Sequence, residues 1–137
     1  MEPSAGTGRL LHAILHGPAE RLDFEAVEIN AGLAARLEAR GLPCRCADFL
    51  ECNGNLGTFD RIVMNPPFQN AADVAHIRHA FDLLKPGGRL VAVCANGPRQ
   101  REAFRATAAE WIDLEPGTFL ESGTGVNAAL VVLEVPV

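Results

Sequence analysis

Residues 65–68, Asn-Pro-Pro-Phe, are the segment of this sequence whose residue types most directly suggest chemistry. The consecutive prolines Pro66 and Pro67 fix the backbone and lack N–H groups, which leaves the carbonyl oxygen of Pro66 free to accept a hydrogen bond. The side-chain oxygen of Asn65 provides a second acceptor, and two neighbouring acceptors suit an amino group with two N–H bonds. Phe68 offers a ring face for stacking. A site for a planar amine is favoured over a rigid turn that merely ends a strand, because such a turn requires neither Asn65 nor Phe68.

A glycine-containing turn lies at the start of the chain, where residues 2–8 read Glu-Pro-Ser-Ala-Gly-Thr-Gly. Gly6 and Gly8 stand two positions apart, immediately before a predicted helix. Glycines in such a turn let the backbone approach a ligand closely, and the start of the helix directs N–H groups toward it. This pattern is common, so its meaning depends on the residues that follow.

Two acidic residues follow the glycine turn at a regular spacing. Glu28 lies 20 residues after Gly8, at the end of a predicted strand, and Asp48 lies 20 residues after Glu28, at the end of the next one. A carboxylate at the first position can accept from both hydroxyls of a ribose. Asp48 can accept from the exocyclic amine of adenine while Phe49 covers the ring. Each acid alone could be a surface or turn residue, but together they predict a ligand site at one edge of a parallel sheet.

The elements that must position these residues alternate between strands and helices. Helices are predicted over residues 8–16, 74–84 and 99–110, and another is predicted between an N-cap at Asn30 and a C-cap at Gly41. Strands are predicted at 24–28, 44–47, 60–64, 90–94, 111–114 and 128–135. Residues 85–88, Lys-Pro-Gly-Gly, predict a turn. The alternation predicts a single α/β domain over residues 1–137, with a doubly wound and mostly parallel sheet.

Composition limits the partners and the location that the sequence supports. The 137 residues carry 12 basic and 17 acidic side chains and a net charge of −5, so bulk attraction to nucleic acid is not expected. No apolar run approaches the ~18 residues of a membrane span, and no signal peptide is recognised. Cys44, Cys46, Cys52 and Cys94 therefore predict reduced thiols in a cytoplasmic protein. Their spacing matches no usual zinc motif, so no metal site is predicted.

Two further groups of polar side chains are open to two interpretations each. Arg99, Arg101 and Arg105 follow a predicted strand on the side of the sheet where a substrate should lie. Contact with nucleic-acid phosphates and a solvated helix face fit these arginines equally well. His76 and His79 lie three apart on a predicted helix and are interpreted as packing residues rather than as a catalytic pair.

Taken together, the motifs resemble those of class I S-adenosylmethionine-dependent methyltransferases of the amino-methylating group, over nearly the whole chain. Residues 2–8 resemble the first motif of that family, with Ser4 where many members have glycine, and residues 65–68 match its [DNS]-P-P-[YFW] catalytic motif. Residues 118–127 further resemble small adenine-specific DNA methylases. The resemblance implies S-adenosylmethionine as cofactor, bound by Glu2, Ser4, Ala5, Gly6, Gly8, Glu28, Ile29, Asp48, Phe49 and Asn65, and catalysis by Asn65, Pro66, Pro67 and Phe68.

The resemblance also implies a Rossmann-like sheet with strand order 3-2-1-4-5-7-6, in which the last strand is antiparallel. The first strand of that order should precede Glu2, yet Glu2 follows Met1 directly. Because that strand is central, its absence would leave its neighbours unpaired. An N-terminal truncation or a misassigned start is the expected explanation.

Three functions are compatible with this reading. The favoured one is methylation of the N6 amine of adenine in DNA, supported by residues 65–68 and 118–127. The alternatives are methylation of guanine N2 in RNA or of a glutamine amide in a protein, and a non-catalytic module that keeps the fold. The expected partner is thus a nucleic acid, DNA before RNA, or a protein, and not a membrane. Transfer would be an in-line displacement, preceded in duplex DNA by flipping of the base.

Overall fold

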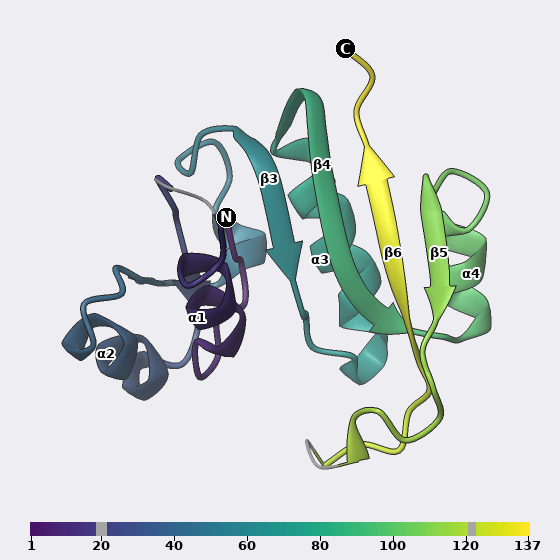
Figure 1. Cartoon of the computed structure of the whole chain (residues 1–137), viewed down its shortest axis with the longest axis horizontal. Coiled ribbons are helices and arrows are strands. Elements are labelled where there is room, and N and C mark those ends of the chain that lie inside the picture. Colours follow the sequence, from purple (N-terminus) through teal and green to yellow (C-terminus); the bar gives the residue numbers. More distant parts are fainter. Residues whose placement is uncertain (19–21, 121–122) are drawn as a thin grey trace.

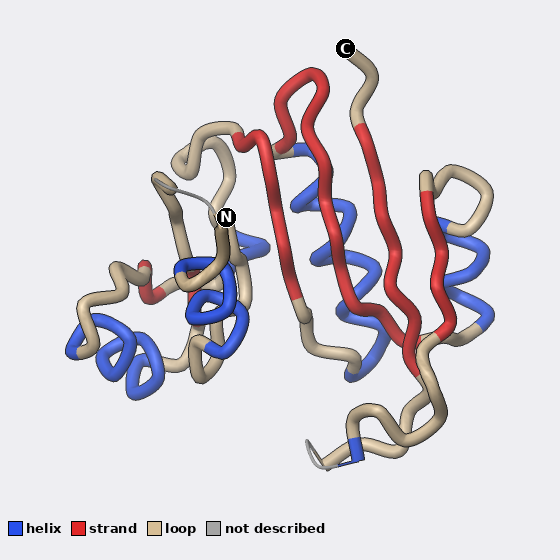
Figure 2. The backbone as a smooth tube through the Cα atoms, in the orientation of Figure 1, coloured by secondary structure: helices blue, strands red, loops and turns tan. Residues whose placement is uncertain are grey.

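The computed structural model describes residues 1–18, 22–120 and 123–137, and its elements alternate largely as predicted (Figures 1 and 2). The helices are α1 (Arg9–Leu15), α2 (Ala31–Ala39), α3 (Ala72–Asp82) and α4 (Pro98–Phe104), with short 3-10 turns η1 (Phe49–Glu51) and η2 (Gln69–Ala71). The strands are β1 (Val27–Glu28), β2 (Arg45–Cys46), β3 (Phe59–Met64), β4 (Leu84–Ala95), β5 (Glu110–Asp113) and β6 (Ala128–Glu134).

The strands form two groups that are joined by the first two residues of the chain. β1 and β2 pair in parallel, and a second sheet has the order β3-β4-β6-β5. β3 and β4 are parallel, whereas β6 is antiparallel to both β4 and β5. Glu2 pairs in parallel with Ala26, and the amide N–H of Val63 donates to the carbonyl of Met1 at 3.0 Å.

This arrangement confirms the predicted strand order, including the antiparallel last strand. Read across the molecule, the order is β2, β1, residues 1–2, β3, β4, β6 and β5. Met1 and Glu2 therefore occupy the place of the first strand and hydrogen-bond to both neighbours. The amino group of Met1 also donates to the carbonyl of Arg61 at 2.8 Å.

Local sequence signals explain where α2 begins and ends. The Asn30 side chain accepts a hydrogen bond from the amide of Leu33 at 3.0 Å, as an N-cap residue should. Gly41 follows the helix with a φ of 76°, in the left-handed region that glycine adopts without strain. Both predicted ends of this helix are confirmed.

Several predicted boundaries are wrong. The helix predicted across 74–84 ends at Asp82, and Leu84 is the first residue of β4. The helix expected across 99–110 ends at Phe104, because the amides of Thr107 and Ala108 both turn back to the carbonyl of Phe104 and the chain then enters β5. The turn at 85–88 lies inside β4 rather than before it. Phe59 pairs with Leu84, but Arg61 pairs with Arg89. Residues 85–88 therefore form a bulge within the longer strand β4.

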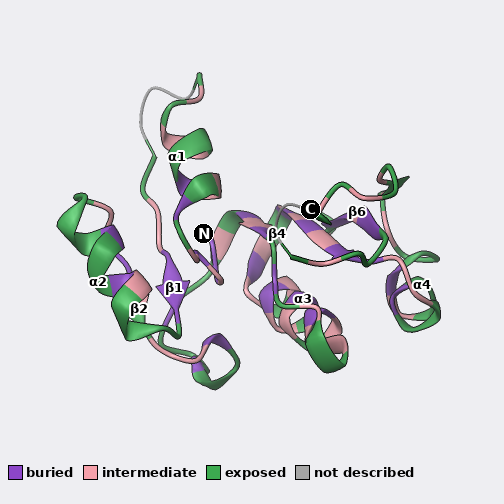
Figure 3. Cartoon of the chain, turned by 90° about the horizontal axis from the view of Figure 1, so that it is seen from below, coloured by how far each residue is buried: buried purple, intermediate pink, exposed green. Residues whose placement is uncertain are grey.

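The apolar core has two parts, which follow the two strand groups (Figure 3). The larger part lies between β3, β4, β6 and helices α3 and α4, and includes the fully buried side chains of Ile62, Ile77 and Leu90. The smaller part packs α1 and α2 against Ala26, which precedes β1, and includes the buried side chains of Leu11 and Leu37. The loops that follow β1, β2 and β3 meet between these two parts, and the functional residues lie there.

Candidate active site

A cavity of about 300 Å³ opens where the glycine turn meets the ends of β1, β2 and β3. It is lined by Pro3, Ser4, Glu28, Ile29, Ala47, Asp48, Phe49, Leu50, Pro67 and His76. Six of the residues that the sequence singled out thus line one cavity: Ser4, Glu28, Ile29, Asp48, Phe49 and Pro67. The structure places them at the carboxyl ends of successive strands, where open α/β sheets bind ligands.

Glu28 joins the end of β1 to the glycine turn. Its Oε2 accepts from the amide of Gly6 at 2.7 Å, and its Oε1 accepts from the amide of Asn30 at 2.8 Å. The side chain is buried, yet it lines the cavity. Each carboxylate oxygen can accept a second hydrogen bond, so Glu28 can shape the turn and still receive ligand hydroxyls.

The glycine turn is tied to β1 and packed tightly against α2. The amide of Ala5 donates to the carbonyl of Val27 at 3.0 Å. Gly6 and Gly8 have φ values of 56° and 81°, which non-glycine residues rarely adopt. A Cβ on Gly8 would lie 2.5 Å from a methyl group of Leu37, so a side chain here would displace Leu37 as well as strain the backbone.

Glu2, the first residue of the motif, is buried beside Leu11 rather than on the cavity wall. Burial raises the pKa of its carboxyl to about 8, and a hydrogen bond from the Leu11 backbone opposes that rise only in part. Its Oε2 has no hydrogen-bond partner among the described residues.

Asp48 and Phe49 follow β2 and have different surroundings. Asp48 caps η1, because its Oδ1 accepts from the amide of Leu50 at 2.9 Å, and it lines the cavity. Phe49 is only 3% exposed and belongs to the larger core. Its ring centroid lies 5.8 Å from that of His76 and 4.7 Å from that of His79. Phe49 therefore forms part of the cavity floor.

The Asn-Pro-Pro-Phe segment leaves β3 and leads to α3. Asn65 and Pro67 are exposed, Pro66 is buried and Phe68 is half-buried. The ring of Phe68 meets the ring of Phe119 edge to face, with centroids 6.1 Å apart. Phe119 comes from the segment 118–127, of which residues 121–122 lie outside the described part of the chain. An exposed amide and a pair of aromatic rings thus lie at the end of β3.

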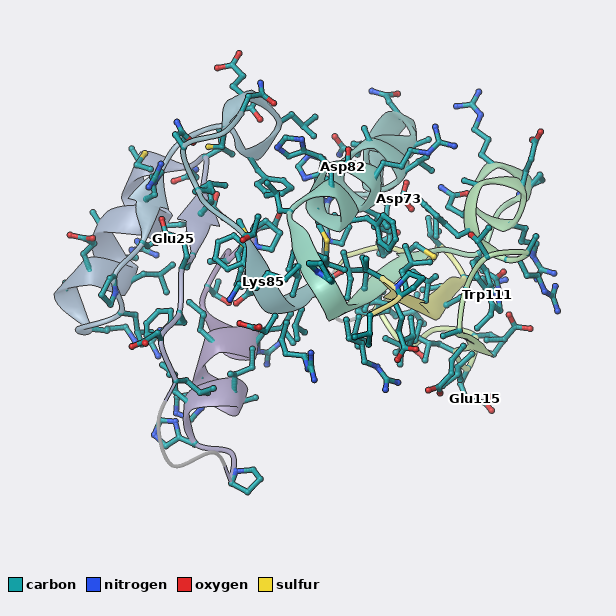
Figure 4. The ribbon with its side chains drawn as sticks, turned by 90° about the horizontal axis from the view of Figure 1, so that it is seen from above. Glu25, Asp73, Asp82, Lys85, Trp111 and Glu115 are labelled. Atoms are coloured by element: carbon teal, nitrogen blue, oxygen red, sulfur yellow. The ribbon has the colours of Figure 1, made fainter. Side chains whose placement is uncertain are left out.

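The segment is held in place by Asp73 in the first turn of α3. Asp73 is fully buried and lies on the side of α3 that faces α4 (Figure 4). Its Oδ2 accepts from the amide of Ala95 at 2.8 Å, and its Oδ1 accepts from Nε2 of Gln100 at 3.0 Å. These bonds join the start of α3 to the end of β4 and to α4. Residues 65–71 are therefore anchored at both ends.

None of the three arginines is among the residues that line the cavity. Arg99 and Arg101 lie on α4, which follows the carboxyl end of β4, whereas Arg105 follows the end of that helix. Arg101 donates through Nε to Oδ1 of Asn96 at 2.9 Å and lies 3.9 Å from the carboxylate of Asp113. The positive charge of Arg101 is therefore partly balanced by the carboxylate of Asp113.

Pro3, Ala47, Leu50 and His76 line the cavity but were not assigned to it from the sequence, and neither was Phe119 beside Phe68. His76 was interpreted as a packing residue, yet it lines the cavity. Phe119 lies 51 positions after Phe68, and only the fold brings the two rings together. Among the described residues, no group of three His, Cys, Asp or Glu side chains is arranged to hold a metal ion, and no helix has the length and apolarity to cross a membrane.

A family model described as the methyltransferase small domain matches residues 5–110, which include Gly6 and Gly8 of the glycine turn, Glu28, Asp48 and residues 65–68. The chain belongs to this family of methyltransferases. The family uses S-adenosylmethionine as its cofactor. A comparison with curated protein sequences gave no significant match.

Solved structures similar to this methyltransferase domain have the same fold. TrmN from Thermus thermophilus is 24% identical, with a TM-score of 0.67 over 98% of this chain and 42% of that protein. The M protein of the type I restriction enzyme EcoKI is 18% identical, with a TM-score of 0.73 over 98% of this chain and 39% of that protein. A candidate RNA methyltransferase from Pyrococcus horikoshii is 20% identical, with a TM-score of 0.68 over 99% of this chain and 74% of that protein. The chain thus spans about two fifths of the first two proteins.

Proposed function

We propose that this domain transfers a methyl group from S-adenosylmethionine to an exocyclic amino nitrogen, with N6 of adenine in DNA as the favoured acceptor. The observation that carries the proposal is the position of Asn65. Its exposed amide lies at the end of β3, two residues before Pro67, which lines the cavity together with Glu28 and Asp48. This position supports a site for the acceptor amine beside the cofactor cavity.

The residues of the cavity fit the cofactor. Glu28 can accept from ribose hydroxyls, and Asp48 keeps Oδ2 to accept from the adenine amine while Oδ1 caps η1. The turn at Gly6 is open, since a Cβ there would meet only the carbonyl oxygen of Ser4, at 4.0 Å. When bound, S-adenosylmethionine supplies an electrophilic methyl group.

The chain's own residues position the acceptor amine. Asn65 Oδ1 and the carbonyl of Pro66 accept its two N–H bonds, which directs the nitrogen lone pair away from them. Phe68 stacks on the planar group, and Phe119 supports the ring of Phe68 edge-on. No general base is needed before transfer, because the nitrogen becomes acidic only once it is methylated. The catalytic contribution is placement rather than proton removal.

The choice of DNA rests on similarity together with the site. The EcoKI M protein belongs to a restriction enzyme, and residues 118–127 resemble adenine-specific DNA methylases. Guanine N2 in RNA and a glutamine amide in a protein present the same two N–H bonds. The net charge of −5 fits a protein acceptor at least as well as a nucleic acid. The acceptor assay must therefore include all three classes.

The test measures transfer of labelled methyl groups from S-adenosylmethionine to adenine-containing DNA, to RNA and to protein fractions. DNA should be labelled, and DNA in which purine replaces adenine should not, because purine lacks the amine. Asn65→Ala should reduce transfer by about 100-fold or more, the loss expected when a group that stabilises the transition state is removed. Although the resemblance counts Asn65 among the cofactor residues, Asn65 does not line the cavity, so the affinity for S-adenosylhomocysteine should stay within roughly threefold of the wild type.

Asn53→Ala provides the matched control, because Asn53 is an exposed loop asparagine outside the cavity. It should transfer methyl groups like the wild type. Labelling of RNA or protein alone would refute adenine in DNA as the acceptor. Failure of the folded domain to bind S-adenosylhomocysteine would refute the proposed enzymatic function and leave the non-catalytic module.

A further inference from the structure

His76 is a titratable side chain on the cavity wall for which the proposed reaction has no role. It extends from α3 to the part of the cavity that Asp48, Phe49 and Pro67 form. The Phe49 ring lies close to His76 and also to His79, one turn further along the same helix, with ring centroids 5.8 and 4.7 Å away. His76 thus shares the cavity wall with Asp48, which can accept from the adenine amine.

The surroundings of the imidazole ring determine which nitrogen can serve a ligand. Nδ1 of His76 is buried and has no hydrogen-bond partner among the described residues. A buried N–H without an acceptor is less tolerable than a buried lone pair, so the favoured neutral form carries its hydrogen on Nε2. Nε2 is the nitrogen that remains to reach the cavity. The ring therefore presents a donor to whatever occupies this part of the cavity.

The charge state agrees with this assignment. Burial lowers the pKa of His76 below its usual value of 6.5, and the neighbouring His79 lowers it further. Asp48 and Asp73 act in the opposite direction without cancelling the effect of burial. His76 is thus neutral at pH 7, with one donor and one buried acceptor. A neutral donor beside the acceptor Asp48 complements a purine, which combines ring nitrogen acceptors with an amine donor.

We propose that His76 is a recognition residue for the adenine ring of the cofactor, and that its Nε2–H donates to one purine ring nitrogen while Asp48 accepts from the exocyclic amine. The proposal rests on the proposed function, because it concerns the same cofactor site. It adds a specificity determinant that excludes nucleosides without an acceptor at that ring position. The contact involves binding alone and no covalent step.

The first experiment uses the unaltered domain and calorimetric titration with S-adenosylhomocysteine and its 1-deaza, 3-deaza and 7-deaza analogues. Each analogue replaces one ring nitrogen by C–H and thus removes one acceptor. One analogue should bind about tenfold more weakly than the parent compound, because it leaves the donor of His76 unpaired. If all three analogues bind within roughly threefold of the parent, the proposal is wrong.

Three substitutions then assign the contact to His76. His76→Gln can place an amide N–H near the position of Nε2 and should keep affinity within roughly threefold, whereas His76→Leu should lose about tenfold. The penalty for the sensitive analogue should disappear in His76→Leu, and a penalty that persists there belongs to another donor and refutes the role of His76. His79→Leu is the matched control, since His79 is not a cavity-lining residue, and it should bind like the wild type.

Two measurements keep these outcomes distinct. Thermal unfolding without ligand shows whether each variant is folded, and a comparison of the four compounds on the unaltered domain needs no variant at all. Glu28→Ala should lose affinity for the parent compound and for all analogues alike. If the unaltered domain binds none of the compounds, the proposed function fails, whereas normal binding with no sensitive analogue refutes only the role of His76.

Discussion

Replacing Asp73 by alanine should lower the free energy of unfolding by about 2–6 kcal/mol. Its carboxyl group is fully buried and accepts from the Ala95 amide at 2.8 Å and from Gln100 Nε2 at 3.0 Å. Alanine leaves both buried donors without a partner, and each buried unsatisfied group costs about 1–3 kcal/mol. A domain of this kind is stable by only about 5–15 kcal/mol, so the loss should be easily measured.

The assay is urea unfolding followed by circular dichroism, with Asp73→Asn and Gln100→Leu as companions. The Asp73→Asn variant retains one acceptor for the Ala95 amide and can pair with a flipped Gln100 amide, so about half of the loss should be recovered. The double variant Asp73→Ala, Gln100→Leu should lose less than the sum of the single losses, because the two side chains share a hydrogen bond. Destabilisation of Asp73→Ala by less than about 1 kcal/mol, with additive losses, would refute the anchoring role.

Two further predictions concern the glycine turn. The pKa of Glu2 is about 8 in the folded state against an ordinary value of 4.5. Between these pH values the folded state retains a proton that the unfolded state releases. The free energy of unfolding should therefore fall as pH rises from 4.5 to about 8. The stability of Glu2→Gln relative to the wild type should therefore increase across that range, by at most about 1.4 kcal/mol per pH unit. A difference in stability that does not depend on pH would contradict the burial argument. Gly8→Ala should cost about 2–4 kcal/mol because it adds a clash with Leu37 to an unfavourable φ. Gly41→Ala, with a φ of 76° and no described atom within 4 Å of the added Cβ, should cost only about 1 kcal/mol, and equal losses in urea unfolding would show that the Leu37 contact is unimportant.

Much of the fold followed from short-range signals in the sequence. Asn30 and Gly41 marked both ends of α2, since a cap and a left-handed glycine act on their own turn of helix. The spacing from Gly8 to Glu28 and Asp48 placed each acid at the end of a strand, and the structure brings both acids to the same cavity. The family was likewise predicted from its motifs, and the order of the strands followed from that resemblance.

Other features were determined only by tertiary packing. The α4 boundary was wrong because β5 pairs with β6 and takes up residues that could otherwise extend a helix. The partners of Glu28, Asp73 and Phe68 lie 22, 27 and 51 residues away along the chain, at Gly6, Gln100 and Phe119. Periodicity and spacing describe neighbours along a helix or strand, whereas these contacts depend on how the elements cross. The sequence determined which chemical groups reach the edge of the sheet, and only the folded chain decided which of them meet there and which, like Glu2, are buried beneath it.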